Sequence, residues 1–403
     1  MTPMSPGVAT APEHEQDAPA EPGSLRFRRL WLFSPGADLS ILVIPLALTL
    51  AAAGASAFMA PTAADGAHRL MAWTAQNILG NATHVVLTFL LFGVHRDVLR
   101  AAPNQPRNIL AGSLAMLAVG AGLFFTSYAD RDVHLFAVAV IFNVFGMHHT
   151  LSQHRGLWSL HGLRGGQAGL PAPSPLERRL QQLYVPLLLS VLLTRIFFVA
   201  ESAAPNAPAY LDVGQGVVLP WQTLPVLIAL WLVYFLLLFR AVLRSGGASG
   251  PKVLYLLGMA TATGLALVAP SWGYVMLPGM HGLEYYVLSA RMLEPREGDP
   301  PRLGRKLIWP AMVASMLPLL ALGVVHGFLL DGPARGSLGI SGGAQAHPLL
   351  RGLTSLGFAV VLAHYFADAF IFRFRIPSIR QVMLRRLGLA GAARPPLPAP
   401  GAR

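Results

Sequence analysis

The chain has 403 residues, of which 54% are hydrophobic and only 12% are charged, and its mean hydropathy is +0.53. This composition excludes an ordinary soluble enzyme and is typical of a polytopic membrane protein. The sequence contains no cysteine, so disulfides and thiolate metal ligands are excluded and any metal must be bound by His and carboxylate groups. A basic inner face against anionic lipid accounts for the net charge of +12 without any nucleic acid partner.

Three regions follow one another along the chain. Residues 1–25 are rich in Pro, Ala and Glu and lack the basic and apolar parts of a signal peptide, so we predict a disordered cytoplasmic tail there. Residues 26–376 hold the apolar segments and are predicted to form a transmembrane helical bundle. Residues 377–403 are predicted to be a basic cytoplasmic tail.

The apolar segments between the tails are each long enough to cross about 30 Å of hydrocarbon as a helix. Lipid permits only helices or closed barrels, and the segments lack the alternation of barrel strands, so the predicted fold is all-α. Ten spans are predicted: residues 38–59, 74–94, 108–128, 133–151, 183–203, 221–242, 253–269, 271–293, 307–330 and 350–372.

The positions of Lys and Arg support this segmentation, because cytoplasmic loops carry an excess of both. With the amino terminus inside, 25 of the 30 basic residues fall at or beyond the inner ends of the spans, four fall at or beyond the outer ends, and only Arg195 lies in the interior of a span. Both termini are therefore predicted to be cytoplasmic. The expected location is the inner membrane of a bacterium.

Polar residues in the second predicted span lie on one face. Asn77, Asn81, His84, Thr88 and His95 are spaced so that, at about 100° per residue, all five stay within about 60° of one another. We expect this stripe to face the interior of the bundle.

The fourth predicted span ends in a run of histidines. Asn143, Thr150 and His154 share a helix face, whereas His148 and His149 look in two adjacent directions. Of the 13 histidines, eight fall between the membrane midplane and the cytoplasmic loops. This bias toward one leaflet predicts a common site.

The eighth and tenth spans each carry a carboxylate one turn from a histidine: His281 with Glu284, and His364 with Asp368. A carboxylate within a span costs about 2.5 kcal/mol or more unless it is paired, hydrated or bound to a cation. Imidazole and carboxylate together are the ligand set of non-haem iron, with zinc and manganese as alternatives. The predicted metal ligands are His84, His148, His149, His281, Glu284, His364 and Asp368. The side chains predicted to orient them are Asn77, Asn81, Thr88, Asn143 and Tyr285.

Several of these residues also have a purely structural interpretation. His84 fits an interhelical hydrogen bond, and Asp368 fits an ion pair with Arg375 near the interface. Arg195 fits either a counter-ion of Glu284 or a lipid head-group contact. The histidines near the water interface fit simple solvation: His95, His154 and His161.

Histidines dispersed singly over several spans, here His84, His281 and His364, resemble the pattern of the Brp/Blh family of bacterial carotene-cleaving membrane oxygenases. This resemblance implies His-bound iron and oxygen chemistry. The membrane desaturases and hydroxylases are only distantly similar, because their HxxxH and HxxHH boxes are absent. The leading hypothesis is a membrane oxygenase or oxidase that binds one or two irons and takes an apolar lipid or isoprenoid substrate from the bilayer.

Three alternatives remain open from the sequence. Two histidines on facing spans would suit a haem-binding protein, since non-covalent haem needs no cysteine. The intramembrane Glu, Asp and His groups would also suit the relay of a proton- or ion-coupled transporter. A structural membrane protein with satisfied polar groups is the third.

Overall fold

The computed structural model describes residues 30–58, 84–127, 133, 137, 139–204, 207, 209–210, 218–296, 299, 303–324 and 348–389. Within these ranges the chain forms helices and two isolated bridges, so the predicted all-α fold is confirmed for the described part. The elements that matter below are α1 (Pro35–Phe58), η3 (His84–Val86), α3 (Leu87–Val94), α4 (Arg96–Leu99), α5 (Gln105–Ser127), η4 (Ala139–Phe145), α7 (Gly146–Gln167), α8 (Pro175–Phe198), α9 (Thr223–Arg244), α10 (Gly250–Val268), α11 (Pro270–Leu293), α12 (Ile308–Val324), α15 (Pro348–Ile371) and α16 (Pro377–Arg386).

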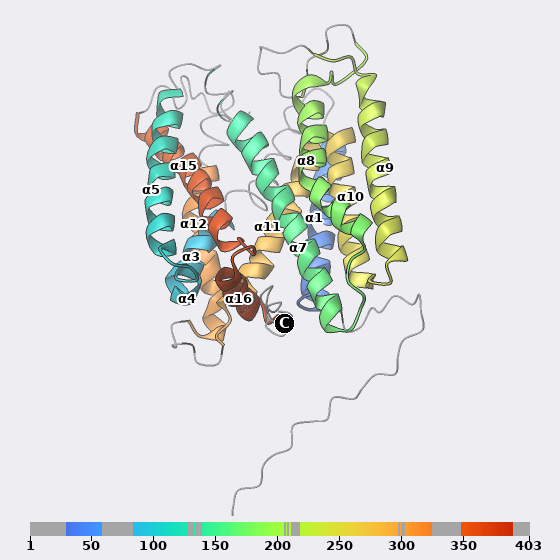
Figure 1. Cartoon of the computed structure of the whole chain (residues 1–403). Coiled ribbons are helices and arrows are strands. Elements are labelled where there is room, and N and C mark those ends of the chain that lie inside the picture. The colour runs from blue at the N-terminus through green and yellow to red at the C-terminus, as the bar shows by residue number, and fades with distance from the viewer. Residues whose placement is uncertain are drawn as a thin grey trace, which may run out of the picture.

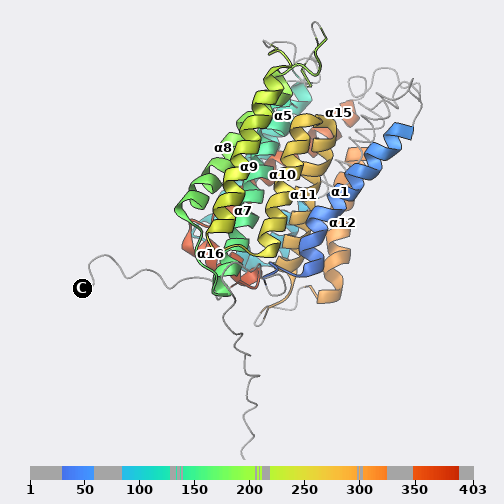
Figure 2. The same cartoon turned by 90° about the vertical axis from the view of Figure 1, so that its right-hand side faces the viewer.

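The long helices run roughly along one axis and form two groups (Figures 1 and 2). One group contains α5, α15, α12 and α3, and the other contains α8, α9, α10 and α1. Helices α7 and α11 lie between the groups in Figure 1, and they pack against each other and against members of the second group. The side chains of α7 and α11 therefore reach the centre of the bundle.

Local sequence explains where several helices begin. The hydroxyl oxygens of Ser174 and Ser249 accept the backbone N–H of Glu177 and Lys252 at 3.1 and 3.3 Å, which caps α8 and α10. Pro270 starts α11 directly after α10, where a missing N–H costs nothing. In this tight hairpin a Cβ on Gly273 would lie 2.1 Å from the Ala266 Cα, so only glycine permits the close helix approach.

Each of the ten predicted spans overlaps at least one of these helices. Six helices of the described chain are long and apolar enough to cross a membrane: those within α1, α5, α8, α9, α10 and α15. The other four predicted spans overlap helices that are shorter or more polar. Helix α12 is described over 17 residues, α7 carries polar residues through much of its length, and α11 carries His281 and Glu284.

The carboxyl-terminal part of the described chain stays on the bundle. Residues 377–386, which the sequence assigned to a tail, form α16, with Ile379, Met383 and Leu384 buried. Helix α16 packs against α4 and α11 at the end of the bundle where α4 lies (Figure 1).

Candidate metal centre

Four imidazoles from four different elements meet in the centre of the bundle: His84 of η3, His149 of α7, His281 of α11 and His364 of α15. The Nε2 atoms of His84 and His281 are 3.1 Å apart. Ring centroids of His149 lie 4.9 Å from His281 and 5.2 Å from His364. Two nitrogens bound to one ion at about 2.1 Å lie about 3.0–3.4 Å apart when adjacent and about 4.2 Å apart when opposite. The spacing of the imidazoles is compatible with a single ion.

Asp368 completes this group, which we call the His/Asp cluster. Its Oδ2 atom lies 3.6 Å from His149 Nε2 and 3.5 Å from His364 Nε2. Separately, one ligand atom from each of His84, His149 and His364 lies within 4.8 Å of the others. Four neutral imidazoles and one carboxylate carry a single negative charge, which a divalent cation would offset in a buried site.

Hydrogen bonds hold the far side of the Asp368 carboxylate. Thr88 and Tyr285 donate their hydroxyls to its Oδ1 atom at 2.6 and 2.7 Å, and the two hydroxyls contact each other. Thr88 Oγ1 also lies 3.1 Å from His364 Nδ1. If that nitrogen donates, the Nε2 lone pair of His364 is free for a metal, as in other oriented imidazole ligands.

Several polar atoms of the cluster are buried and have no hydrogen-bond partner in the described part of the chain: His149 Nε2, His364 Nε2, Asp368 Oδ2 and His281 Nδ1. Leaving such a group unpaired costs about 1–3 kcal/mol. Asp368 Oδ2 lies 3.6 Å from His149 Nε2 and 3.5 Å from His364 Nε2, so three of these atoms lie close together. A cation bound by these atoms would satisfy all three at once.

Glu284 lies in a different environment, which we call the Glu284 cluster. Its Oε1 accepts the Tyr255 hydroxyl at 2.7 Å and lies 3.5 Å from His154 Nε2, and its Oε2 accepts Gln153 Nε2 at 3.2 Å. The Tyr184 hydroxyl lies 3.5 Å from the other nitrogen of His154. Polar side chains of α7, α8 and α10 therefore surround the carboxylate that the sequence grouped with the metal ligands.

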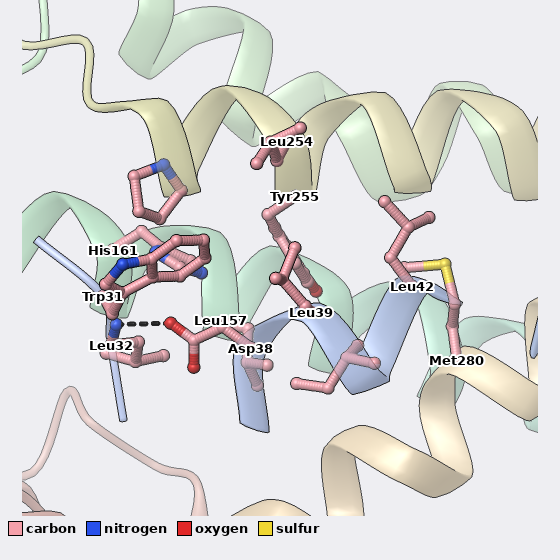
Figure 3. A pocket seen from close by; sticks show the side chains of 12 residues that line it. Trp31, Leu32, Asp38, Leu39, Leu42, Leu157, His161, Leu254, Tyr255 and Met280 are labelled. Carbon is pink, nitrogen blue, oxygen red and sulfur yellow. Dashed lines mark hydrogen bonds between the residues drawn. The ribbon is translucent and has the colours of Figure 1, made fainter. Parts of the chain in front are cut away.

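A pocket adjoins the Glu284 cluster at the start of α1 (Figure 3). Tyr255 and His161 line it together with Trp31 and Asp38, and the remaining lining is largely leucine. Asp38 accepts the backbone N–H of Leu32 at 2.6 Å, which fixes the chain leading into α1. The sequence offered no signal for Tyr255, because it stands alone in an apolar run.

The remaining predicted site residues differ in their exposure and in whether the structure describes them. His148 is exposed, whereas its neighbour His149 faces the cluster. Asn143 is buried in η4, and Asn77 and Asn81 lie outside the described residues.

The structure contains the interhelical hydrogen bond expected of His84, to His281 of α11 at 3.1 Å, but the structural interpretations of the other polar residues are wrong. His95, His154 and His161 are buried rather than solvated. Arg375 is exposed, whereas Asp368 turns inward to its hydroxyl and imidazole neighbours, which excludes the proposed ion pair. Arg195 is buried and donates to the carbonyls of Leu267 and Val199 at 2.9 and 3.3 Å.

Comparison with known proteins gives no relative for this chain: no family model, no curated protein and no solved structure matches it. The function is therefore inferred from the site itself.

Proposed function

We propose that this protein is a membrane metalloenzyme whose metal is held by the His/Asp cluster. The observation that supports this most directly is the convergence of four imidazoles and one carboxylate from four helical segments far apart in the sequence. Polar atoms in an apolar interior need polar partners, and His149 Nε2, His364 Nε2 and Asp368 Oδ2 have none among the described residues, which a bound cation would supply.

We propose non-haem iron as the metal and an oxygenase or oxidase as the activity. Imidazole and carboxylate ligands suit iron, and bound iron would supply the activation of dioxygen. An apolar lipid or isoprenoid is the proposed substrate, because a site inside a bundle with apolar outer faces is reached most directly from the bilayer. Exposed leucines and valines along α5 and α9 are consistent with that setting.

The haem alternative fits the geometry less well. The imidazoles touch one another, with centroids of His84 and His281 only 4.7 Å apart, and a porphyrin between two axial ligands would have to separate them. The transporter alternative remains an outcome of the tests below, because the Glu284 cluster would also suit a proton relay.

We further propose ten membrane spans with both termini in the cytoplasm, in a bacterial inner membrane. The six long apolar helices and the asymmetry of Lys and Arg support this topology. Reporter fusions after Arg107, Arg179 and Lys252 should show cytoplasmic activity. Fusions after Arg131 and Asn206 should show the outer side, and any reversal would refute the arrangement.

The metal site is tested by purifying the full chain in detergent, measuring bound metals and recording the visible spectrum. Iron without an intense Soret band is expected. A Soret band would favour haem, and a metal-free protein would favour the transporter.

Two adjacent histidines give a matched pair of variants. His149→Ala should lower the metal content strongly, whereas His148→Ala should leave it unchanged, because only His149 faces the cluster. His364→Ala and Asp368→Ala should behave like His149→Ala. Full metal occupancy in all three of these proteins would rule out the His/Asp cluster as the site.

A further inference from the structure

An ion cluster outside the apolar part of the bundle joins the ends of the helices that carry the proposed ligands. Arg386 of α16 is its centre, and its side chain is only 3% exposed. Its Nη1 and Nη2 donate to Asp299 at 2.5 and 2.8 Å, and its Nε donates to Asp97 at 3.0 Å. We call these three residues the Arg386 clamp.

Each member of the clamp follows one ligand-bearing element along the chain. Asp97 lies in α4, directly after α3 and His84; Asp299 follows α11, which carries His281; and Arg386 lies in α16, after α15 with His364. One guanidinium thus connects three of the four segments that meet in the His/Asp cluster. The fourth segment, α7, is tied to α11 separately, because Gln153 donates to the His281 carbonyl at 3.1 Å.

Neighbouring contacts hold the clamp itself in place. Arg296 donates its side chain to the Arg386 carbonyl at 2.8 Å and its backbone N–H to Asp299 at 2.6 Å. Gly388, at φ +74°, ends α16 with a left-handed residue, and Leu389 N–H donates to the Leu384 carbonyl at 2.7 Å. His95 Nε2 lies 3.2 Å from the Leu293 carbonyl, which joins the end of α3 to the end of α11 a second time.

Arginines lower the pKa of both carboxyl groups of the clamp. The hydrogen bonds from Arg386 hold the pKa of Asp299 at about 2. At Asp97 burial acts in the opposite direction, but hydrogen bonds from Arg386 and Arg385 outweigh it and lower the pKa of that carboxyl. A planar guanidinium can bind two carboxylates at once, which a lysine ammonium does less well.

We propose that Arg386 is a positioning residue for the metal centre: it fixes the ends of η3–α3, α11 and α15 and thereby sets the spacing of His84, His281 and His364. A metal site requires its ligands within a few tenths of an ångström, so loosening the helix ends weakens the site without removing any ligand. This inference rests on the proposed metal site.

The chain offers a close control for Arg386 in its neighbour. Arg385 also contacts Asp97, with Nη2 at 2.5 Å from Oδ2, but its side chain is 54% exposed and it has no contact with Asp299 among the described residues. Removing Arg385 therefore subtracts a surface ion pair and leaves the connection between the helices intact.

The test measures helix spacing and metal retention in the full chain in detergent. Because the sequence lacks cysteine, spin labels can be placed at Arg100→Cys in the turn that ends α4 and Arg380→Cys in α16, both of which are exposed. Arg386→Gln should broaden the distance distribution between the labels. It should also accelerate loss of Co²⁺ to a chelator at least about tenfold and alter the visible spectrum of the Co²⁺-loaded protein.

Arg385→Gln should change none of these quantities, and Arg386→Lys should fall between Arg386→Gln and the parent protein. Unchanged Co²⁺ loss and spectrum in Arg386→Gln would overturn the proposal, whether or not the label distances broaden. If Arg386→Gln fails to fold, parent-like behaviour of Arg386→Lys would overturn it equally. A parent protein that binds no metal would refute the proposed function instead, while the label distances would still show whether Arg386 holds the helix ends together.

Discussion

Thr88 offers the sharpest test of how the His/Asp cluster is organised, because it contacts two proposed ligands and coordinates nothing itself. Its hydroxyl donates to Asp368 at 2.6 Å and lies 3.1 Å from His364 Nδ1. Valine has nearly the same shape without the hydroxyl. Thr88→Val removes both contacts and leaves the carboxylate with the Tyr285 hydroxyl at 2.7 Å.

Loss of a group that orients metal ligands commonly lowers metal affinity by about 10–100-fold, which corresponds to about 1.4–2.8 kcal/mol. We expect Thr88→Val to fall in this range when Fe²⁺ or Co²⁺ affinity is measured by competition with a chelator. Thr126→Val is the control, since the hydroxyl of Thr126 is exposed and, among the described residues, contacts only backbone carbonyls of α5. Equal affinity in the two variants would refute the role assigned to Thr88.

Three further outcomes follow from other parts of the structure. Glu284→Gln should keep its metal, because the Glu284 carboxylate is bound by Tyr255 and Gln153. Loss of metal, measured by elemental analysis, would return Glu284 to the ligand set. Gly273→Ala should lower the unfolding temperature, by overpacking worth about 1–3 kcal/mol, since its Cβ would lie 2.1 Å from the backbone of α10. Gly122→Ala should not lower it, because no described atom lies within 4 Å of the added Cβ. The pKa of Asp299 is lowered to about 2 by its pairing with Arg386. This pairing therefore stabilises the fold fully above the ordinary aspartate pKa of about 4, and the stabilisation is lost as the pH falls toward 2. Asp299→Asn should flatten the acid branch of a plot of unfolding temperature against pH.

Apolar runs predicted the helices well because a membrane span is set by length and hydropathy, both of which are local properties of the sequence. The sequence also predicted that His84, His281, His364 and Asp368 belong together, since their common depth requires only a rise of about 1.5 Å per residue. The structure brings these four side chains into one cluster. Depth along a helix can be calculated from the sequence.

Direction around a helix axis was much harder to predict. The sequence predicts both His148 and His149 as ligands, yet His148 is exposed and His149 contacts the cluster. Their rotation depends on how α7 packs against α8, α10 and α11, which the sequence does not encode locally. The preceding π-helix η4 adds to the difficulty, because its wider turn shifts the phase of any 100° projection carried through it.

Glu284 and Asp368 also show that rotation about the helix axis decides which side chains meet. Each follows a clustered histidine by one turn, but Asp368 is at i+4, rotated by about 40° from His364, whereas Glu284 is at i+3, rotated by about 60° in the opposite sense from His281. The first rotation leaves Asp368 among the imidazoles. The second turns Glu284 toward α10, where Tyr255 donates to it at 2.7 Å. A difference of one residue in spacing therefore separates Asp368, which is suited to binding a cation, from Glu284, which is satisfied by hydrogen bonds. The proposed metal site keeps a single negatively charged ligand as a result.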